Sequence, residues 1–575
     1  MKKTILIICF FLAILIAKAQ SQTFQWAKST NKEYDGNAQD IATDALGNAY
    51  ITGTFSSSTI KFGDITLNKV SASSGTDVFI AKFDKNGNVL WAKNTSILKY
   101  VQGSSIAIAT DANSNVFITG AFDVAAANFN GTILSHTSVG SSSDIFIVKY
   151  DAQGNLLWAK NTGYTNTVWV YDIATDTKGN ALITGSFSNA PITFGNVTIP
   201  NFANVNPFLV KYDSSGNVIW AKGATQTKFS GVTVWSFAVA TDLNDNVFIT
   251  GDYAKTSSSN LSFGTYTLPI CNGRNMYVVK YDNLGKELWA KSSIGNTFGG
   301  VQASGFDITT DLNGNCIATG SFNIPTINFG AITLTNSSTT NDISEIFVLK
   351  YNASGNEVWA KKAGGTSDDE GHKISTDKDG NTYVTGYFKS KSATFGSFVV
   401  NKSNSDEPLF FVLKYNNLGN EVWVKFVEKT NAYGGGLMTN GVSADNFGNL
   451  YVTGNALNSN QYGSAIFGST TLTLGGIFIA KLGESTTGIV PPSHFENIIS
   501  IFPNPSNGII TVSSSQFIEN IDVYDVTGKL VYNQQKNNKP TNTTLDLSAL
   551  NNGIYFIHLQ TKNGEVIKSK VVVSK

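Results

Sequence analysis

The chain has 575 residues, 41% of them hydrophobic and 12% aromatic, so it can bury a substantial core and is not a disordered polymer. Lysine and arginine together number 41, aspartate and glutamate also number 41, and the formal net charge is +0. Arg274 is the one arginine, and without a guanidinium-rich basic face the chain is not expected to bind nucleic acid.

Residues 1–19 have the pattern of a secretory signal peptide. A short basic segment precedes an apolar run over residues 5–16, and a small-x-small site ends at Ala19. The alternative is a transmembrane anchor, but the run is shorter than the ~20 residues that a membrane-spanning helix needs. We therefore expect cleavage between Ala19 and Gln20.

Two motifs recur through the middle of the chain. A tryptophan segment, usually Trp-Ala-Lys, recurs at Trp26, Trp91, Trp158, Trp220, Trp289, Trp359 and Trp423. A Thr-Gly pair recurs with its glycine at Gly53, Gly120, Gly185, Gly251, Gly320, Gly386 and Gly454. Successive pairs are 65 to 69 residues apart, so one structural unit is copied about seven times.

Each unit contains four segments of strand length that are rich in β-branched and aromatic residues. In the first unit they are residues 40–44, 49–55, 78–83 and 89–93. Asp-x-x-Gly-Asn turns join the first segment to the second and the third to the fourth. Aspartate bonds its own turn and glycine takes positive φ, which predicts hairpins. A calcium loop is the alternative, but each turn carries one carboxylate where such a loop needs several.

Four antiparallel strands repeated radially describe a propeller blade. The chain enters this region with a tryptophan strand, residues 24–28, and leaves it with a third strand, residues 478–481, that no tryptophan strand follows. Joining these ends completes a seventh blade and removes an exposed sheet edge. An open β-solenoid is the alternative, but it does not explain the two incomplete ends. We therefore predict an all-β chain with a seven-bladed β-propeller over residues 24–482, closed by its N-terminal strand.

These repeats resemble the bacterial β-propeller repeats known as SBBP. The resemblance covers roughly residues 24–482 and rests on the tryptophan, Thr-Gly and Asp-x-x-Gly-Asn motifs. It implies the fold but not the ligand, because such propellers serve varied functions.

Ligand-binding candidates lie on the predicted blade-to-blade connections, which share one face of the propeller. Aromatic rings there suit a sugar or a peptide, although packing between blades is the alternative. The aromatic candidates are Tyr100, Trp169, Tyr171, Trp235 and Phe298. A repeated Phe-Gly element between the second and third strands is expected to be a structural hairpin.

One acidic cluster, Asp368, Asp369 and Glu370 followed by His372, falls on a predicted connecting loop in the sixth repeat. It suits a cation or acid–base chemistry, with a solvated charged loop as the alternative. The other histidines lie in separate segments, so no metal site is expected. We assign no catalytic residue and expect no cofactor.

Two cysteines remain after signal cleavage, Cys271 and Cys316, in neighbouring repeats. A disulfide between them and two free buried thiols are both open.

The repeats end at residue 482. Residues 483–497 read as a linker, and residues 498–575 contain short alternating strands that predict a small β-sandwich. The order of a Pro-Asn-Pro opening at residues 503–505, a Gly-x-Tyr strand at 553–555 and a lysine-rich tail resembles the type A C-terminal sorting domain of type IX secretion. An accessory carbohydrate-binding sandwich is the alternative.

The resemblance implies export through the periplasm of a Gram-negative bacterium to the medium or the outer-membrane surface, with the type IX secretion machinery as a partner. We expect a non-catalytic binding or adhesion propeller whose ligand is a surface glycan or an extracellular protein. A secreted hydrolase or lyase acting on polysaccharide or peptide is the alternative.

Overall fold

The structure is a computed structural model, and the chain divides into two compact units, Met1–Ser485 and Thr486–Lys575. All secondary structure in the described residues is β, and no helix among them is long and apolar enough to span a membrane. The described residues are 22–30, 36–71, 75–97, 105–122, 126–136, 143–165, 167–226, 232–255, 261–269, 271, 273–295, 303–338, 343–402, 408–429, 437–456, 464–473, 475–484, 499–502, 506–514, 518–535, 543–561 and 566–575.

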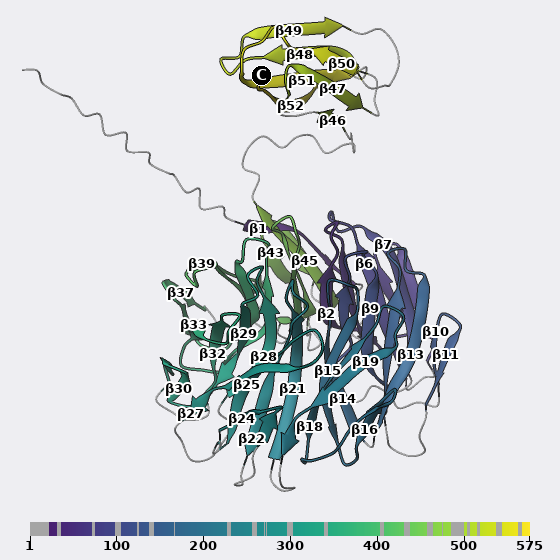
Figure 1. The fold of residues 1–575 in the computed structure, drawn as a ribbon, viewed down its shortest axis with the longest axis vertical. Coiled ribbons are helices and arrows are strands. Elements are labelled where there is room, and N and C mark those ends of the chain that lie inside the picture. The colour runs from purple at the N-terminus through teal and green to yellow at the C-terminus, as the bar shows by residue number, and fades with distance from the viewer. Residues whose placement is uncertain are drawn as a thin grey trace, which may run out of the picture. The chain divides into compact units, whose positions relative to one another are not determined.

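The described part of the larger unit contains seven four-stranded antiparallel arrays, which we number sheets 1 to 7 (Figure 1). Sheet 1 consists of β2 (Gly36–Thr43), β3 (Ala49–Phe55), β6 (Thr76–Phe83) and β7 (Val89–Ile97). Sheet 2 consists of β8 (Ala107–Thr110), β9 (Val116–Phe122), β12 (Ser143–Tyr150) and β13 (Leu156–Thr165). Sheet 3 consists of β14 (Thr167–Thr175), β15 (Ala181–Ser188), β18 (Asn206–Tyr212) and β19 (Val218–Gly223). Sheet 4 consists of β21 (Val232–Thr241), β22 (Val247–Lys255), β25 (Arg274–Tyr281) and β26 (Glu287–Ser292).

The remaining three sheets follow the same order. Sheet 5 consists of β28 (Ala303–Thr310), β29 (Cys316–Phe322), β32 (Glu345–Tyr351) and β33 (Glu357–Gly364). Sheet 6 consists of β34 (Asp369–Thr376), β35 (Thr382–Phe388), β38 (Leu409–Tyr415) and β39 (Glu421–Phe426). Sheet 7 consists of β41 (Leu437–Ala444), β42 (Leu450–Ala456), β45 (Gly476–Glu484) and β1 (Gln22–Ser29).

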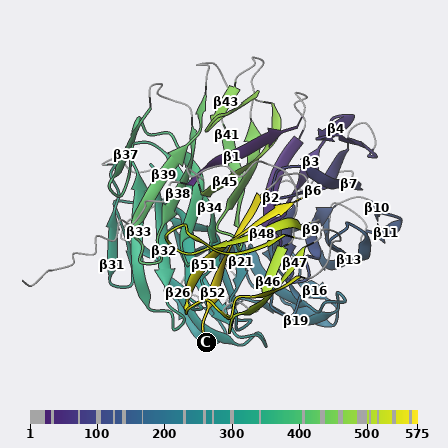
Figure 2. The same ribbon diagram turned by 90° about the horizontal axis from the view of Figure 1, so that it is seen from above.

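A short hairpin follows the second strand of each sheet, and Figure 2 shows these hairpins at the periphery of the larger unit. Six of them turn at the Phe-Gly element, where glycine takes φ between 53° and 60°, as the sequence predicts. The hairpins are β4–β5 (Thr59–Phe62, Ile65–Asn68), β10–β11 (Ala126–Phe129, Thr132–Ser135), β16–β17 (Ile192–Phe194, Val197–Ile199), β23–β24 (Leu261–Phe263, Tyr266–Leu268), β30–β31 (Thr326–Phe329, Ile332–Thr335), β36–β37 (Ser392–Phe395, Phe398–Asn401) and β43–β44 (Ser464–Phe467, Thr470–Thr473). Two-residue strands extend three of them: β20 (Thr225–Gln226), β27 (Ile294–Gly295) and β40 (Glu428–Lys429).

Sheet 7 is built from both ends of the larger unit. Strand β1 pairs antiparallel with β45, and Trp26 lies opposite Lys481 in this ladder. The backbone groups along that edge of β45 therefore have partners that a free edge strand would lack.

Hydrogen bonds link the first strands of neighbouring sheets, which we call the inner strands. Thr110 Oγ1 donates to the carbonyl of Thr43, and the same bond recurs from each sheet to the one before it up to sheet 6. Sheet 7 joins sheet 6 through the Ala444 amide, which donates to Ser375 Oγ, and Thr43 Oγ1 donates to the carbonyl of Ala444. The series of bonds therefore returns to sheet 1.

In five of the seven sheets, the recurring tryptophan and a lysine of the third strand donate to the same turn carbonyl of the next sheet. Trp91 Nε1 and Lys82 Nζ both donate to the carbonyl of Ala152 in the next sheet, at 3.2 and 3.0 Å. Trp26 and Lys481 make the same pair of bonds to Lys85, so sheet 7 meets sheet 1 as other sheets meet each other. We call this arrangement the Trp–Lys clamp.

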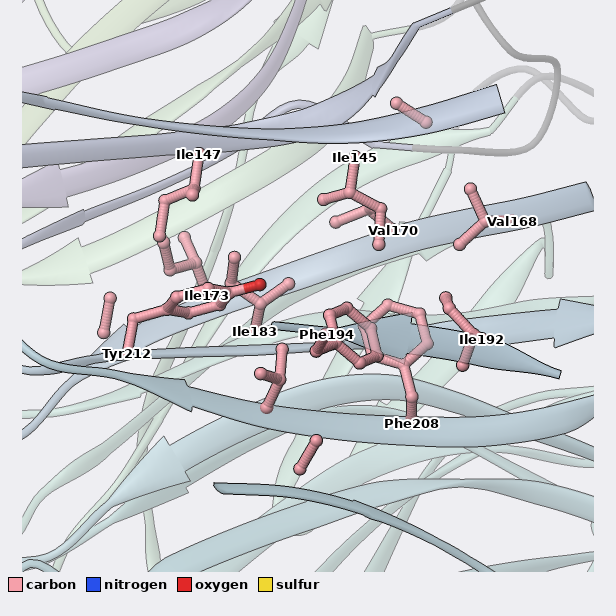
Figure 3. Packing of buried hydrophobic residues seen from close by; sticks show 14 of the residues in the cluster. Ile145, Ile147, Val168, Val170, Ile173, Ile183, Ile192, Phe194, Phe208 and Tyr212 are labelled. Carbon is pink, nitrogen blue, oxygen red and sulfur yellow. The ribbon is translucent and has the colours of Figure 1, made fainter. Parts of the chain in front are cut away.

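Hydrophobic cores lie between neighbouring sheets. Figure 3 shows the core between sheets 2 and 3, where Ile145 and Ile147 of one sheet face Val170 and Ile173 of the next. Phe194 of the outer hairpin and Phe208 extend this core, and their ring centroids are 5.2 Å apart. Every sheet therefore buries both faces, which accounts for the nearly continuous apolar second and third strands.

The Asp-x-x-Gly-Asn segments are hairpin turns, as predicted. In the first of them, one carboxylate oxygen of Asp44 accepts the amides of Leu46 and Asn48, and Gly47 takes φ of 78°. Lys82 lies 3.5 Å from the other oxygen. The carboxylate of the turn aspartate thus accepts hydrogen bonds from its own turn and forms an ion pair with the clamp lysine.

Cys271 and Cys316 are both buried thiols that form no disulfide, which decides between the two alternatives left open by the sequence. Burial raises the pKa of the Cys316 thiol to about 12.

The smaller unit has seven strands in its described part, arranged in two antiparallel sheets around one core that includes Ile521, Leu545 and Ile557. One sheet contains β46 (Ile499–Phe502), β47 (Ile509–Ser514) and β50 (Thr543–Asp546). The other contains β49 (Leu530–Gln535), β48 (Ile518–Tyr524), β51 (Gly553–Thr561) and β52 (Val566–Val573).

Candidate functional site

Six inner strands carry a β-bulge at the same position, five residues before the aspartate of the turn. In β14, for example, Val170 pairs with Gly185 and Asp172 with Thr184, which leaves Tyr171 as the extra residue. The bulged residues are Gln39, Tyr171, Phe237, Phe306, His372 and Asn440. A bulge redirects the extra side chain out of the regular alternation.

The Thr-Gly pair of the repeat exists because of this bulge. A Cβ atom at Gly320 would lie 1.9 Å from the carbonyl oxygen of Ser304 on the bulged inner strand, and Gly53, Gly251 and Gly386 would meet the same clash. Gly53 lies inside β3, opposite the bulge.

The bulged side chains surround a pocket of about 380 Å³. Residues of all seven sheets, or of the chain just before their inner strands, line it. They are Asn37, Gln39, Asp40, Ser105, Tyr171, Phe237, Phe306, Glu370, His372, Lys373, Thr439 and Asn440.

One half of the pocket wall is aromatic. Tyr171, Phe237, Phe306 and His372 come from four successive inner strands, β14, β21, β28 and β34. Consecutive ring centroids are 5.1, 6.4 and 5.9 Å apart, so the rings form a continuous row, which we call the aromatic crescent.

The other half of the wall carries amides and hydroxyls, and we call it the amide wall: Asn37, Gln39, Ser105, Thr439 and Asn440. Gln39 Oε1 accepts the amide of Ile106, and Asn440 Nδ2 donates to the carbonyl of Ala38. Thr439 is 2% exposed, and its Oγ1 has no hydrogen-bond partner in the described part of the chain.

A charged layer lies one residue further along the inner strands. Asp40, Asp172 and Asp307 follow three of the bulged residues, and Lys373 follows His372. Each aspartate accepts its own next amide and an amide of the following sheet; Asp172, for example, accepts Ile173 and Val239, both at 2.8 Å. The carboxylates therefore tie neighbouring sheets together.

Electrostatics in this layer are dominated by burial. Burial raises the pKa of Asp172 to about 8, with the charges of Asp307 and Asp40 adding to the effect, and it raises the pKa of Asp40 to about 6. Burial opposes the charge on Lys373, but the three carboxylates outweigh it and raise the lysine pKa. The layer thus holds one ammonium group among three carboxyl groups.

The acidic cluster of the sixth repeat lies only in part on the predicted connecting loop: Asp368 precedes strand β34, but the prediction is wrong for the two residues after it. Asp369 and Glu370 begin strand β34. Asp369 is fully buried and accepts hydrogen bonds from Ser390 Oγ and from the amide of Gly365, both at 2.7 Å. Its role in the structure is to hold the neighbouring backbone, and it does not line the pocket.

The other two acids of this cluster, Asp368 and Glu370, have different partners and different positions from Asp369. Asp368 lies 3.6 Å from Lys389 Nζ and accepts the amide of Ser344. Glu370 lines the pocket, with its Oε2 2.9 Å from His372 Nε2. Although burial acts against it, the hydrogen bond from His372 holds the pKa of Glu370 below its usual value.

Three of the aromatic candidates lie in strands rather than on connections, which corrects their predicted place. Trp169 and Tyr171 belong to β14 and Trp235 to β21. The ring centroids of Trp169 and Trp235 are 4.9 Å apart, so these two pack between sheets 3 and 4, while Tyr171 lines the pocket. Tyr100, Phe298, Ala19 and Gln20 lie outside the described residues.

Sequence reasoning missed most of the pocket: Gln39, Phe237, Phe306 and Asn440 were not singled out. A signal was available, because the residue five positions before the turn aspartate changes from repeat to repeat within an otherwise regular strand. Only the strand pairing explains this variation, because the bulge turns the side chain at that position out of the regular alternation of the strand.

Comparisons with known proteins bear on both units. Residues 500–574 match the secretion system C-terminal sorting domain, and residues 358–387 match a β-propeller repeat. The chain is 27% identical over 441 residues to an uncharacterized WD repeat-containing protein of Acanthamoeba polyphaga mimivirus, an alignment that covers 64% of this chain and 31% of that protein. It is 26% identical over 102 residues to beta-agarase D of Zobellia galactanivorans, covering 17% of this chain and 20% of the agarase. The chain thus spans less than a third of either relative.

Two solved structures are also similar to the chain. A Dyadobacter fermentans protein of unknown function is 10% identical with a TM-score of 0.32, covering 67% of this chain and 98% of that one. PorZ, a surface component of the type IX secretion system of Porphyromonas gingivalis, is 10% identical with a TM-score of 0.13, covering 95% of this chain and 100% of that one. The two matched families agree with the strand pattern of the larger unit and with the motifs of the smaller one. The chain therefore contains a β-propeller repeat and a secretion system C-terminal sorting domain.

Proposed function

We propose that residues 24–482 form a seven-bladed β-propeller closed by β1, and that sheets 1 to 7 are its blades. The ladder between β1 and β45 and the returning series of threonine bonds support this arrangement. In the same proposal, residues 1–19 are a signal peptide, residues 483–497 a linker and residues 498–575 a type A sorting domain. The division into two compact units near residue 485 supports these boundaries.

In this proposal, the protein is exported through the periplasm of a Gram-negative bacterium and acts at the cell surface or in the medium. The smaller unit is the signal that the type IX machinery recognises. A chain that ends at Glu484 is expected to stay inside the cell envelope, whereas the complete chain reaches the surface or the medium, as cell fractionation with antibodies to the propeller would measure. Equal export of the two chains would mean that the smaller unit is not the sorting signal.

We further propose that the propeller is a non-catalytic binding or adhesion module whose ligand, an extracellular glycan or protein, enters the pocket among the bulged residues. The observation that carries this proposal is the pocket wall itself, which combines four neighbouring rings with amides and hydroxyls from the remaining sheets. Ligand sites combine apolar surface with placed polar groups, and both kinds of surface line this pocket.

The test screens the purified chain against arrays of glycans and extracellular proteins while hydrolysis products are monitored. We expect retention of at least one array component without product, and loss of this retention in Phe306→Ala. Product formation that disappears in Glu370→Gln would replace binding by catalysis, since Glu370 is the pocket carboxylate paired with a histidine. Retention that is unchanged in Phe306→Ala would mean that the ligand binds outside this pocket.

A further inference from the structure

We infer that the pocket binds an uncharged saccharide, with a sugar ring against the aromatic crescent and its hydroxyl groups on the amide wall. This inference rests on the proposed binding function and names its ligand class.

The aromatic crescent suits the apolar face of a sugar ring. Phe237 and Phe306 are half-buried, whereas the residues on either side of them in their strands are buried. Their rings therefore form part of the pocket surface while their backbone is held by two neighbouring strands. Aromatic rings combine a large apolar area with a defined geometry, so they can hold a flat apolar face at low entropic cost.

The amide wall suits hydroxyl groups, which both donate and accept hydrogen bonds. Amide side chains offer donors and acceptors, and the hydroxyl of Thr439 does the same. The hydroxyl of Thr439 is buried and has no hydrogen-bond partner among the described residues, so its neighbours in the wall leave its hydrogen-bonding capacity unmet.

The charges near the pocket disfavour an anion. Three aspartates and one lysine lie in the layer beside the bulged residues, and Glu370 lies in the wall. A sulfate, phosphate or uronate group would meet this excess of carboxyl groups, and the one lysine among the described residues of the pocket wall, Lys373, already faces Asp40, Asp172 and Asp307.

A cationic ligand is disfavoured for a different reason. The carboxylates of Asp40, Asp172 and Asp307 accept backbone amides from two sheets each, and Glu370 accepts a hydrogen bond from His372. A lysine or arginine side chain would therefore compete with these bonds.

At about 380 Å³ the pocket lies near the lower end of the ~300–1,000 Å³ range of small-ligand sites, which suits one or two sugar rings.

The experiment is affinity electrophoresis of the complete chain in gels that contain laminarin, dextran, galactomannan or xylan, with alginate, heparin and casein peptides as charged or peptidic probes. We expect retardation by at least one neutral polysaccharide and by none of the anionic ones. Phe306→Leu keeps the apolar volume but removes the flat ring, and it should weaken this binding by about tenfold. Phe447→Ala is the matched control, because Phe447 is 64% exposed in the turn after β41, outside the pocket.

The outcomes separate the inference from the proposed function. Retardation only by an anionic polysaccharide or a peptide, lost in Phe306→Leu, would leave the binding function in place and overturn the saccharide. Retardation by a neutral polysaccharide that Phe306→Leu does not change would overturn this pocket as the sugar site. If no probe retards the chain, the saccharide inference is overturned, while the arrays of glycans and proteins still decide the binding function. A thermal unfolding scan of each variant verifies that the fold is intact.

Discussion

Among single side chains, Asp172 shows how burial and charge are combined at the centre of the larger unit. Its carboxylate joins sheets 3 and 4 by accepting Ile173 and Val239, yet burial and two nearby aspartates oppose its ionisation. The pKa is raised to about 8 from an ordinary value of 3.8. Between these two values the folded chain holds a proton that the unfolded chain has lost.

This gives a pH dependence with a definite sign. Because the folded pKa is the higher one, the stability of the natural chain relative to Asp172→Asn should fall as pH rises from about 4 to about 8 and stay level outside that window. Unfolding midpoints at pH 5, 7 and 9 measure the difference. Asp151→Asn is the control: hydrogen bonds from Asn155 and Gln153 lower the pKa of Asp151 despite slight burial, so its contribution is lost only below pH 4. A parallel pH dependence for both variants would contradict the assignment.

Between neighbouring sheets, the Trp–Lys clamp explains why one tryptophan and one lysine recur in each repeat. The tryptophan lies on the fourth strand and the lysine on the third, and both reach the same turn carbonyl of the next sheet. Two tryptophans differ: Trp359 Nε1 and Trp423 Nε1 have no partner within the described residues. For Trp423 the reason is topological, because β45 and β1 of sheet 7 are distant in sequence and no turn joins them.

The clamp predicts unequal effects from one substitution. Trp91→Phe removes the bond to Ala152 but keeps most of the ring, and it should lower the free energy of unfolding by about 1 kcal/mol. Trp359→Phe removes a donor that has no acceptor, so its effect should be close to zero. Denaturant unfolding of both variants gives the comparison. Equal losses would mean that ring volume, and not the hydrogen bond, decides the effect.

Across the larger unit as a whole, β1 takes the place in sheet 7 that the fourth strand of a continuous chain segment takes in the other sheets. Its ladder with β45 extends from Gln22 to Ser29, and Trp26 adds the clamp to sheet 1. Without it, the hydrogen-bonding edge of β45 would be exposed, which is an aggregation hazard.

Deletion of residues 22–29 should therefore lower the thermal unfolding midpoint by about 5 °C or more and promote self-association. Differential scanning calorimetry and light scattering measure the two effects. A synthetic peptide of residues 22–29 added in trans should restore part of the lost stability, which separates strand pairing from a general effect of truncation. An unchanged midpoint would mean that the pairing of β1 with β45 does not stabilise the larger unit.

The sequence by itself determined the period of the repeat, its four strands, the turn chemistry and the type of the smaller unit, because these depend on residues close together in the chain. Turns such as that of Asp44 bond mainly within five residues, and the sorting-domain motifs lie within the last 76 residues. The pocket was decided only by the tertiary structure. Tyr171, Phe237 and Phe306 lie more than 60 residues from one another and meet because the inner strands are neighbours in space. The bulge that directs them depends on strand pairing, and Asp369 was misread for the same reason: its partner Ser390 lies on the far side of that pairing.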